Sequence, residues 1–201
     1  CWNLESRALS QKWDAHRGKS VSSIQMFGVQ SMFVSNGSDN SLRIYVMEHG
    51  QFRLLKSREG FAAPMSCMKF YGADGRHVIA GAMDGTMRMI SLIKDSQSYG
   101  YSMVGEKSIE LSSPIREISF CSNRDLKWAD VVSCHFGMPT CFLWRKSLKS
   151  IDSIRIKSQS QSPVSCCTVS SCGNFGALGT NGGEISIFNL QSGRLVKTIQ
   201  T

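Results

Sequence analysis

The sequence predicts an all-β protein built from four-stranded β-propeller blades. Three observations predict this class: short alternating apolar runs, turns rich in Gly, Asp and Asn between them, and recurrence of the runs at a nearly constant interval. The residues that close the recurring run are Trp2, Tyr45, Ile90, Trp144 and Phe188, at spacings of 43, 45, 54 and 44 residues. A four-stranded propeller blade spans about 40–45 residues, so the interval predicts blades.

Each unit is expected to place four strands in the same order. First strands are expected to end at Phe27, Phe70, Phe120 and Val169, and flatter, more apolar second strands to cover 31–36, 77–82, 130–135 and 175–180. A tight turn leads into the third strand, which ends at the closing residue. The fourth, more polar strand is clearest at 53–57 and 194–199.

A polar network is predicted where the second strand turns into the third. An aspartate in that turn can accept hydrogen bonds from backbone N–H groups and from a histidine in the preceding loop, which ties the loop to the sheet. Asp84 lies 45 residues after Asp39 and occupies the same position. We interpret His16, Ser35, Asp39, Tyr45 and Asp84 as a structural network rather than a catalytic one.

The pattern that predicts this network weakens along the chain. The next two units carry Met138 and Gly182 at the Asp84 position, and the last three carry Ala80, Cys134 and Leu178 at the Ser35 position. Later blades are therefore expected to depend on apolar packing between sheets. Four complete units and a stub are fewer than a closed propeller usually needs, so we expect a fragment of a larger protein.

The net charge of +8 favours polyanionic partners such as RNA. The densest basic group comprises Arg145, Lys146, Lys149, Arg155 and Lys157. No aromatic residue lies between its members to stack on a base. Two interpretations stay open: a solvated basic face, or a surface that contacts RNA or a protein partner.

The cysteines do not have the spacing of a metal site. Eight are present without a CxxC pair, and the nearest approach to a zinc site is Cys134, His135 and Cys141. We therefore expect reduced thiols, no metal and no cofactor. The chain has no membrane-spanning apolar run and no secretory signal, which favours a soluble intracellular protein without a membrane partner.

No catalytic group is supported by the sequence. Asp130, Ser133 and His135 lie close together, but strand alternation places Ser133 and His135 on one face without a nucleophile elbow. The glycines 176, 179, 182 and 183 are not followed by a P-loop lysine. We expect no enzyme and no small-molecule substrate.

Several segments resemble one protein family. They are "WNLESRALSQKWDAH", "FVSNGSDNSLRIYV", "RLLKSREGFAAPMSCMKFYGADGRHVIAGAMDGTMRMISLI", "WADVVSCH" and "SSCGNFGALGTNGGEISIFNLQSG". They are similar to the tandem-propeller WD-repeat family of the small-subunit processome, in the B subcomplex of U3-associated proteins. The segments 128–135 and 172–175 are the most particular to this family.

The resemblance implies an organisation and a role. Residues 1–95 would be the last blades of a first propeller, 96–113 a linker between blades or propellers, and 114–201 the first blades of a second propeller. The implied role is a non-catalytic nucleolar scaffold in the nucleus, in small-subunit ribosome biogenesis. Its implied partners are other propeller and helical-repeat subunits of the processome, with pre-rRNA and guide snoRNA bound directly or indirectly.

The alternative function is a peptide-recognition WD-repeat adaptor of a ubiquitin ligase or of chromatin. Such a protein would use an arginine or an aromatic cage near the central channel. Arg43 and Arg88, at equivalent third-strand positions, are the candidate residues for that role.

Overall fold

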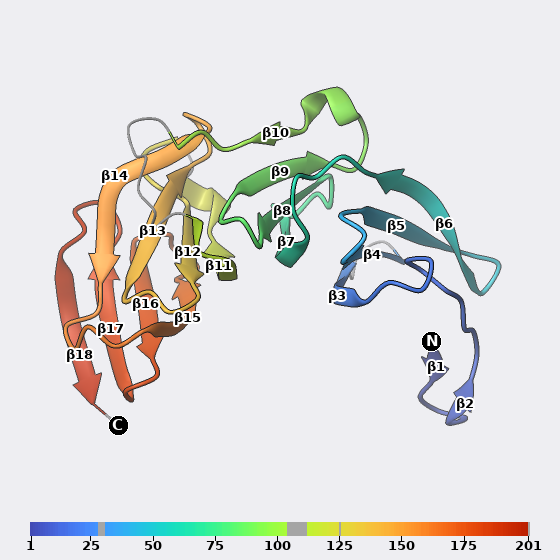
Figure 1. Cartoon of the computed structure of the whole chain (residues 1–201), viewed down its shortest axis with the longest axis horizontal. Coiled ribbons are helices and arrows are strands. Elements are labelled where there is room, and N and C mark those ends of the chain that lie inside the picture. Colours follow the sequence, from blue (N-terminus) through green and yellow to red (C-terminus); the bar gives the residue numbers. More distant parts are fainter. Residues whose placement is uncertain (28–30, 104–111, 125, 201) are drawn as a thin grey trace. The chain divides into compact units, whose positions relative to one another are not determined.

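The computed structural model describes residues 1–27, 31–103, 112–124 and 126–200 (Figure 1). In these residues the regular structure is mainly β-strand, with 3-10 turns that include η1 (Asp95–Gln97) and η3 (Ser122–Arg124). Within the same ranges, no helix has the length and apolar character needed to span a bilayer.

Four antiparallel four-stranded sheets, here called blades A to D, contain most of these strands. Blade A comprises β3 (Val21–Phe27), β4 (Met32–Gly37), β5 (Leu42–Glu48) and β6 (Gln51–Arg58). Blade B comprises β7 (Met65–Tyr71), β8 (His77–Ala82), β9 (Met87–Ser91) and β10 (Tyr99–Gly100). Blade C comprises β11 (Ile115–Phe120), β12 (Val131–His135), β13 (Thr140–Arg145) and β14 (Ser150–Lys157). Blade D comprises β15 (Val164–Val169), β16 (Phe175–Thr180), β17 (Glu184–Asn189) and β18 (Leu195–Gln200).

In every blade the spatial order of the strands follows the chain order. This meander results from alternating apolar positions joined by tight turns, because each strand can pair with the one that has just been completed. The predicted all-β class and the four-stranded units are confirmed, and the predicted closing residues, apart from Trp2, lie in β5, β9, β13 and β17.

Blades A, C and D also share an irregularity in the pairing of their strands. The first two strands shift register between Val21 and Ser23 in blade A, between Ile115 and Glu117 in blade C, and between Val164 and Cys166 in blade D. A β-bulge bends a strand and increases its local twist. Equivalent bulges therefore give these blades the same local geometry, although the residues at the bulge differ.

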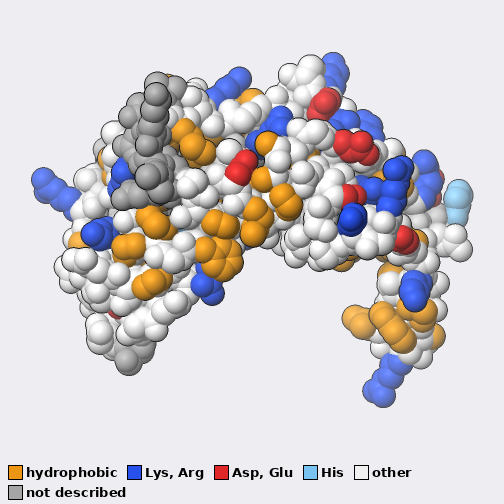
Figure 2. Space-filling view, in the orientation of Figure 1, with side chains coloured by type: hydrophobic (Ala, Val, Ile, Leu, Met, Phe, Trp, Pro, Cys, Tyr) orange, Lys and Arg blue, Asp and Glu red, His pale blue; other side chains and the backbone are white. Residues whose placement is uncertain are grey.

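The chain divides into two compact units, Cys1–Met65 and Ser66–Thr201. The first contains blade A and a short hairpin of β1 (Trp2–Asn3) and β2 (Ala8–Leu9). Hydrophobic side chains are visible on this hairpin at the lower right of Figure 2. An apolar cavity of about 640 Å³ lies between the hairpin and β3 and is lined by Trp13, Ile24, Phe33 and others.

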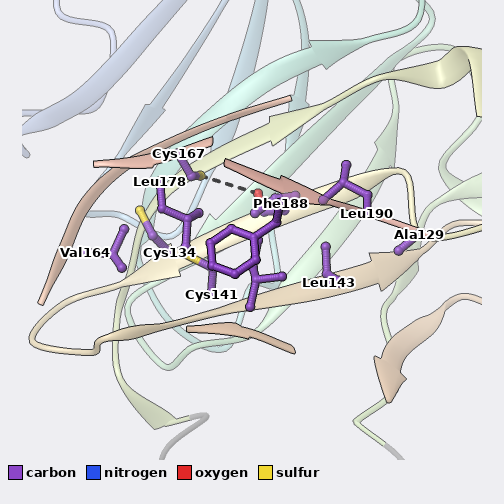
Figure 3. Close-up of a cluster of buried hydrophobic side chains, with 11 residues drawn as sticks. Ala129, Cys134, Cys141, Leu143, Val164, Cys167, Leu178, Phe188 and Leu190 are labelled. Carbon is purple, nitrogen blue, oxygen red and sulfur yellow. Dashed lines mark hydrogen bonds between the residues drawn. The ribbon is translucent and has the colours of Figure 1, made fainter. Parts of the chain in front are cut away.

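The second unit packs blade C between two hydrophobic clusters. Alternate residues of β12 face opposite sides: Val131 joins a cluster with Met87 and Trp144, and Val132 joins another with Leu178 and Phe188. Figure 3 shows the second cluster, between blades C and D. All five residues of β12 are buried, as expected when both faces of a strand are covered.

The predicted boundaries at 95/96 and 113/114 remain a prediction. The segment 96–113 contributes β10, which pairs with β9 and completes blade B. Its residues 104–111 lie outside the described part of the chain.

Candidate functional site

The predicted polar network of blade A brings three of its members together. His16 is fully buried; its Nδ1 donates to Asp39 Oδ1 at 2.9 Å, and its Nε2 lies 2.9 Å from Ser35 Oγ. Gly37 makes room for the imidazole, because a Cβ at this position would lie 2.6 Å from His16 Nδ1. The loop that carries His16 is thereby fastened to β4.

Two further residues extend this network. Ser41 donates from its backbone N–H and its hydroxyl to Asp39 Oδ1, at 3.2 and 2.8 Å. Arg43 donates to the Ala15 carbonyl and, at 3.2 Å, to Asp39 Oδ2. Burial raises the pKa of Asp39, but hydrogen bonds from Ser41 and His16 lower it more, so the carboxyl pKa lies below its usual value. Sequence reasoning missed Ser41, although a serine two residues after a turn aspartate is a recognisable signal.

Tyr45 lies in an aromatic cluster, and Asp84 accepts a backbone hydrogen bond within its own turn, as predicted for an aspartate at this position. The Tyr45 ring stacks on Phe33 with centroids 4.6 Å apart, in an aromatic cluster with Trp13 and Phe52. Asp84 accepts from the backbone N–H and hydroxyl of Thr86, at 3.0 and 2.6 Å. Asp84 therefore stabilises its own turn.

Blade C contains a second buried network. The Trp144 indole N–H donates to Ser133 Oγ at 2.8 Å, and Ser133 Oγ lies 3.1 Å from His135 Nε2. His135 Nδ1 lies 2.8 Å from the Ser113 carbonyl, which can only accept, so Nδ1 carries the hydrogen. Burial lowers the pKa of His135, so the neutral imidazole accepts from the Ser133 hydroxyl through Nε2.

The register corrects one equivalence predicted from the sequence. Ser35 pairs with Arg43, two residues before the closing residue Tyr45, and Ser133 pairs with Phe142, two residues before Trp144. Ser133, not Cys134, therefore occupies the Ser35 position. The turn of blade C is one residue longer, so counting at a fixed interval gives the wrong residue.

The grouping of Asp130, Ser133 and His135 is not a catalytic triad. Asp130 accepts from the Tyr71 hydroxyl at 2.7 Å and from the Lys146 N–H at 2.9 Å. Ser133 and His135 have no exposed surface, so a substrate could not reach them. The three side chains hold loops and strands in place.

Blade D fastens its preceding loop with a carboxylate that the sequence did not single out. Glu184 accepts from the backbone N–H groups of Gln159 and Ser160, at 3.0 and 2.8 Å, and from the Ser186 hydroxyl. Hydrogen bonds from Ser160 and Ser186 lower the pKa of Glu184 to about 2. Gly182 had suggested that this blade lacks such a link, but the acid two residues later provides it.

The predicted basic group is spread along the β13–β14 hairpin. Arg145 forms an ion pair with Asp152 at 2.6 Å, and the Lys146 and Lys149 amines lie 4.5 and 4.6 Å from tyrosine ring centroids. Arg155 lies over the Phe142 ring at 5.2 Å, and Lys157 is exposed. Figure 2 shows Lys and Arg side chains scattered over the visible face. Lys149 and Lys157 remain the exposed candidates for contact with a partner.

The arginines of the alternative function lie within the sheets. Arg43 is 9% exposed and engaged with Ala15 and Asp39, beside a cavity of about 370 Å³ that also includes Arg17 and Glu59. Arg88 is half-buried and pairs with Ala80 in the ladder. The Arg43 guanidinium thus already holds the loop of its own blade.

All eight cysteines are free thiols. Burial raises the pKa of Cys67 to about 11 and that of Cys141 well above its usual range. The grouping of Cys134, His135 and Cys141 does not form a ligand set, because both ring nitrogens of His135 have protein partners.

Comparisons with known proteins find three that are similar to this chain. The chain is 25% identical over 210 residues to WD repeat-containing protein 36 of Homo sapiens, covering 96% of this chain and 24% of that protein. It is 31% identical over 205 residues to the U3 small nucleolar RNA-associated protein 21 homolog of Schizosaccharomyces pombe, covering 96% and 23%. It is 27% identical over 190 residues to U3 small nucleolar RNA-associated protein 21 of Saccharomyces cerevisiae, covering 84% and 20%.

The chain thus spans a quarter or less of the length of these relatives. No protein-family model matches it. The three similarities confirm the resemblance inferred from the sequence, and none of the three names denotes a catalytic activity.

Proposed function

We propose that this chain, a homologue of WD-repeat proteins associated with U3 small nucleolar RNA, is a non-catalytic segment of a scaffold for small-subunit ribosome biogenesis. The observation that carries the proposal is the 31% identity to the fission-yeast relative over 96% of this chain, because that protein is named for its association with U3 RNA. The scaffold would act on pre-rRNA within the processome, in the nucleolus.

The side-chain chemistry supports a structural role. The groups that resemble catalytic machinery, Ser133 with His135 and His16 with Asp39, fasten loops to sheets through buried hydrogen bonds. Loops held in this way present fixed edges to partners, so binding needs little reordering of the backbone. The proposed mechanism is presentation of docking surfaces, with no covalent step.

The proposed partners are other propeller and helical-repeat subunits, together with pre-rRNA and guide snoRNA. Lys149 and Lys157 are the exposed members of the basic group and would supply phosphate contacts. Lys149 immediately precedes β14 and Lys157 is its last residue, so the two amines lie near opposite ends of the strand, which favours contact with an extended backbone rather than with one phosphate.

Sedimentation of the tagged full-length protein that carries this chain tests the proposal. We expect it to sediment with pre-ribosomal particles and to recover U3 RNA. Recovery in light fractions, with ubiquitin-ligase or chromatin subunits in place of U3 RNA, would overturn the proposal in favour of a peptide adaptor.

A charge-reversal pair tests the basic surface separately. Lys149→Glu with Lys157→Glu should reduce recovery of U3 RNA, most strongly at raised salt, because phosphate contacts release counterions. Lys127→Glu with Lys197→Glu, at two other exposed positions, is the control matched in charge. Equal losses in both variants would mean that net charge, not this surface, matters.

A further inference from the structure

Three potential metal ligands meet between blades C and D. A carboxylate oxygen of Glu117 and the Sγ atoms of Cys134 and Cys167 all lie within 4.8 Å of one another. Cys134 is fully buried, Cys167 is 5% exposed, and Glu117 is half-buried. Figure 3 shows the two cysteines on neighbouring blades, in the cluster that joins them.

Strand pairing positions this group. Glu117 in β11 lies directly opposite Cys134 in β12. Cys167 comes from β15 of the next blade, and its backbone N–H donates to Glu117 Oε2 at 3.2 Å. The Cys167 thiol lies 3.8 Å from the carbonyl oxygens of Glu117 and Val132. The pairing of the strands therefore fixes the backbone of the three residues that carry the carboxylate and the two thiols.

The equivalent positions in the other blades of this unit lack such a group. Cys166 in blade D lies opposite Gly179, and a Cβ at Gly179 would lie 2.6 Å from the Cys166 sulfur. In blade B, a Cβ at Gly81 would lie 3.1 Å from the Cys67 sulfur. Blade C instead has a carboxylate on the first strand and a thiol at the position of these glycines.

We propose that Glu117, Cys134 and Cys167 form a zinc site that links blade C to blade D. Two thiolates and one carboxylate are typical zinc ligands, and a water on the exposed side of Glu117 would complete a tetrahedral set. Zinc binding releases the two thiol protons to solvent. The three ionised ligands carry a charge of −3, so the site with Zn²⁺ has a net charge of −1. Lys69 offsets this charge, because its amine lies 3.5 Å from Glu117 Oε1.

The mixture of ligands selects the metal. Thiolates disfavour Mg²⁺ and Ca²⁺, which take oxygen ligands, and the carboxylate makes the site less suited to Cu(I), which prefers sulfur. Zinc accepts both kinds of ligand. The ligands come from three strands separated in the sequence, which explains why cysteine spacing does not reveal this group.

The test is titration of the full chain, reduced and free of metal, with Zn²⁺ and with Cd²⁺ as a spectroscopic probe. We expect one equivalent to bind, thiolate-to-cadmium absorption in the ultraviolet, and a rise of the melting temperature with zinc concentration. Glu117→Gln should weaken binding by about tenfold or more and preserve the fold, because the amide oxygen can still accept from Cys167.

Cysteine variants distinguish this site from adventitious thiol binding. Cys134→Ser and Cys167→Ser should each abolish the one-equivalent cadmium absorption, and Cys166→Ser, at an exposed neighbouring thiol, should retain it. Circular dichroism reports whether each variant folds, and Glu117→Gln keeps the test decisive if a serine variant does not. No uptake by the unsubstituted chain, equal uptake by Cys134→Ser, or a Cys134–Cys167 disulfide in place of metal uptake would overturn the proposal.

Discussion

Blades A and C each join an imidazole to a serine at the same place in the sheet, but the histidine comes from different parts of the chain. In blade A, His16 reaches in from the preceding loop to Ser35. In blade C, His135 is on the strand itself, contacts Ser133, and reaches out to the loop at the Ser113 carbonyl. Both arrangements fasten the preceding loop to the second strand.

The residue two positions after this serine on the second strand decides which arrangement forms. That position is Gly37 in blade A and His135 in blade C. A glycine leaves space for an imidazole from the loop, whereas a histidine fills that space with its own ring. A repeat can therefore keep an interaction although the residue that supplies it has moved to another part of the chain.

The largest expected effect is the loss of His135. His135→Ala would remove a fully buried ring that packs 4.9 Å from Phe142, and would leave Ser133 and the Ser113 carbonyl without this partner. A cavity and unsatisfied polar groups together should lower the free energy of unfolding by about 2–4 kcal/mol. Urea unfolding of the full chain measures this loss. His49→Asn, at an exposed position with φ of 50°, is the control, and an equal loss there would refute the assignment.

A smaller effect is expected at Gly37. Gly37→Ala would push the His16 ring from its place and weaken its bonds to Ser35 and Asp39, at a cost of about 1–3 kcal/mol. In a His16→Ala background the added methyl group has no ring to displace but still lies 2.9 Å from the Ser20 carbonyl oxygen, so Gly37→Ala should remain destabilising and cost about 1 kcal/mol less than in the unsubstituted chain. A double-mutant cycle in urea measures the difference. Simple additivity would show that the two residues do not compete for this space.

Blade D fastens its preceding loop through a carboxylate, so its stability should depend on pH. The pKa of Glu184 is about 2 in the folded chain and 4.5 ordinarily, so its charge stabilises the fold above about pH 4.5 and this contribution is lost as pH falls toward 2. The stability gap between the unsubstituted chain and Glu184→Gln should therefore narrow over that range. Thermal melts at a series of pH values measure the gap. Glu5→Gln controls for the loss of an exposed carboxylate. A stability difference between the unsubstituted chain and Glu184→Gln that stays constant with pH would contradict the link between ionisation of Glu184 and folding.

Strand positions could be predicted from the sequence because alternation and turn residues act locally. The predicted second strand at 77–82 coincides with β8, and that at 175–180 coincides with β16. The link between His16 and Asp39 was also predictable, because an aspartate in this turn can accept a hydrogen bond from a histidine in the preceding loop.

Contacts that depend on register or on a neighbouring blade could not be predicted in this way. One extra residue in the turn of blade C moved the Ser35 equivalent from Cys134 to Ser133. The amine of Lys146 lies over Tyr71, 75 positions earlier in the sequence, and no local pattern signals such a pair. Glu184 was missed because its carboxylate acts from a position where blade A has Ser41.

The meander order of every blade also has a consequence for synthesis. Since each strand pairs with its immediate predecessor, most hydrogen-bonded contacts join residues close in sequence, which favours rapid folding. A blade can begin to form as soon as its own segment leaves the ribosomal tunnel. The apolar face of that blade stays exposed until the next blade has been translated and packs against it. A pause in translation between blades would therefore prolong the time during which chaperones can bind this apolar surface.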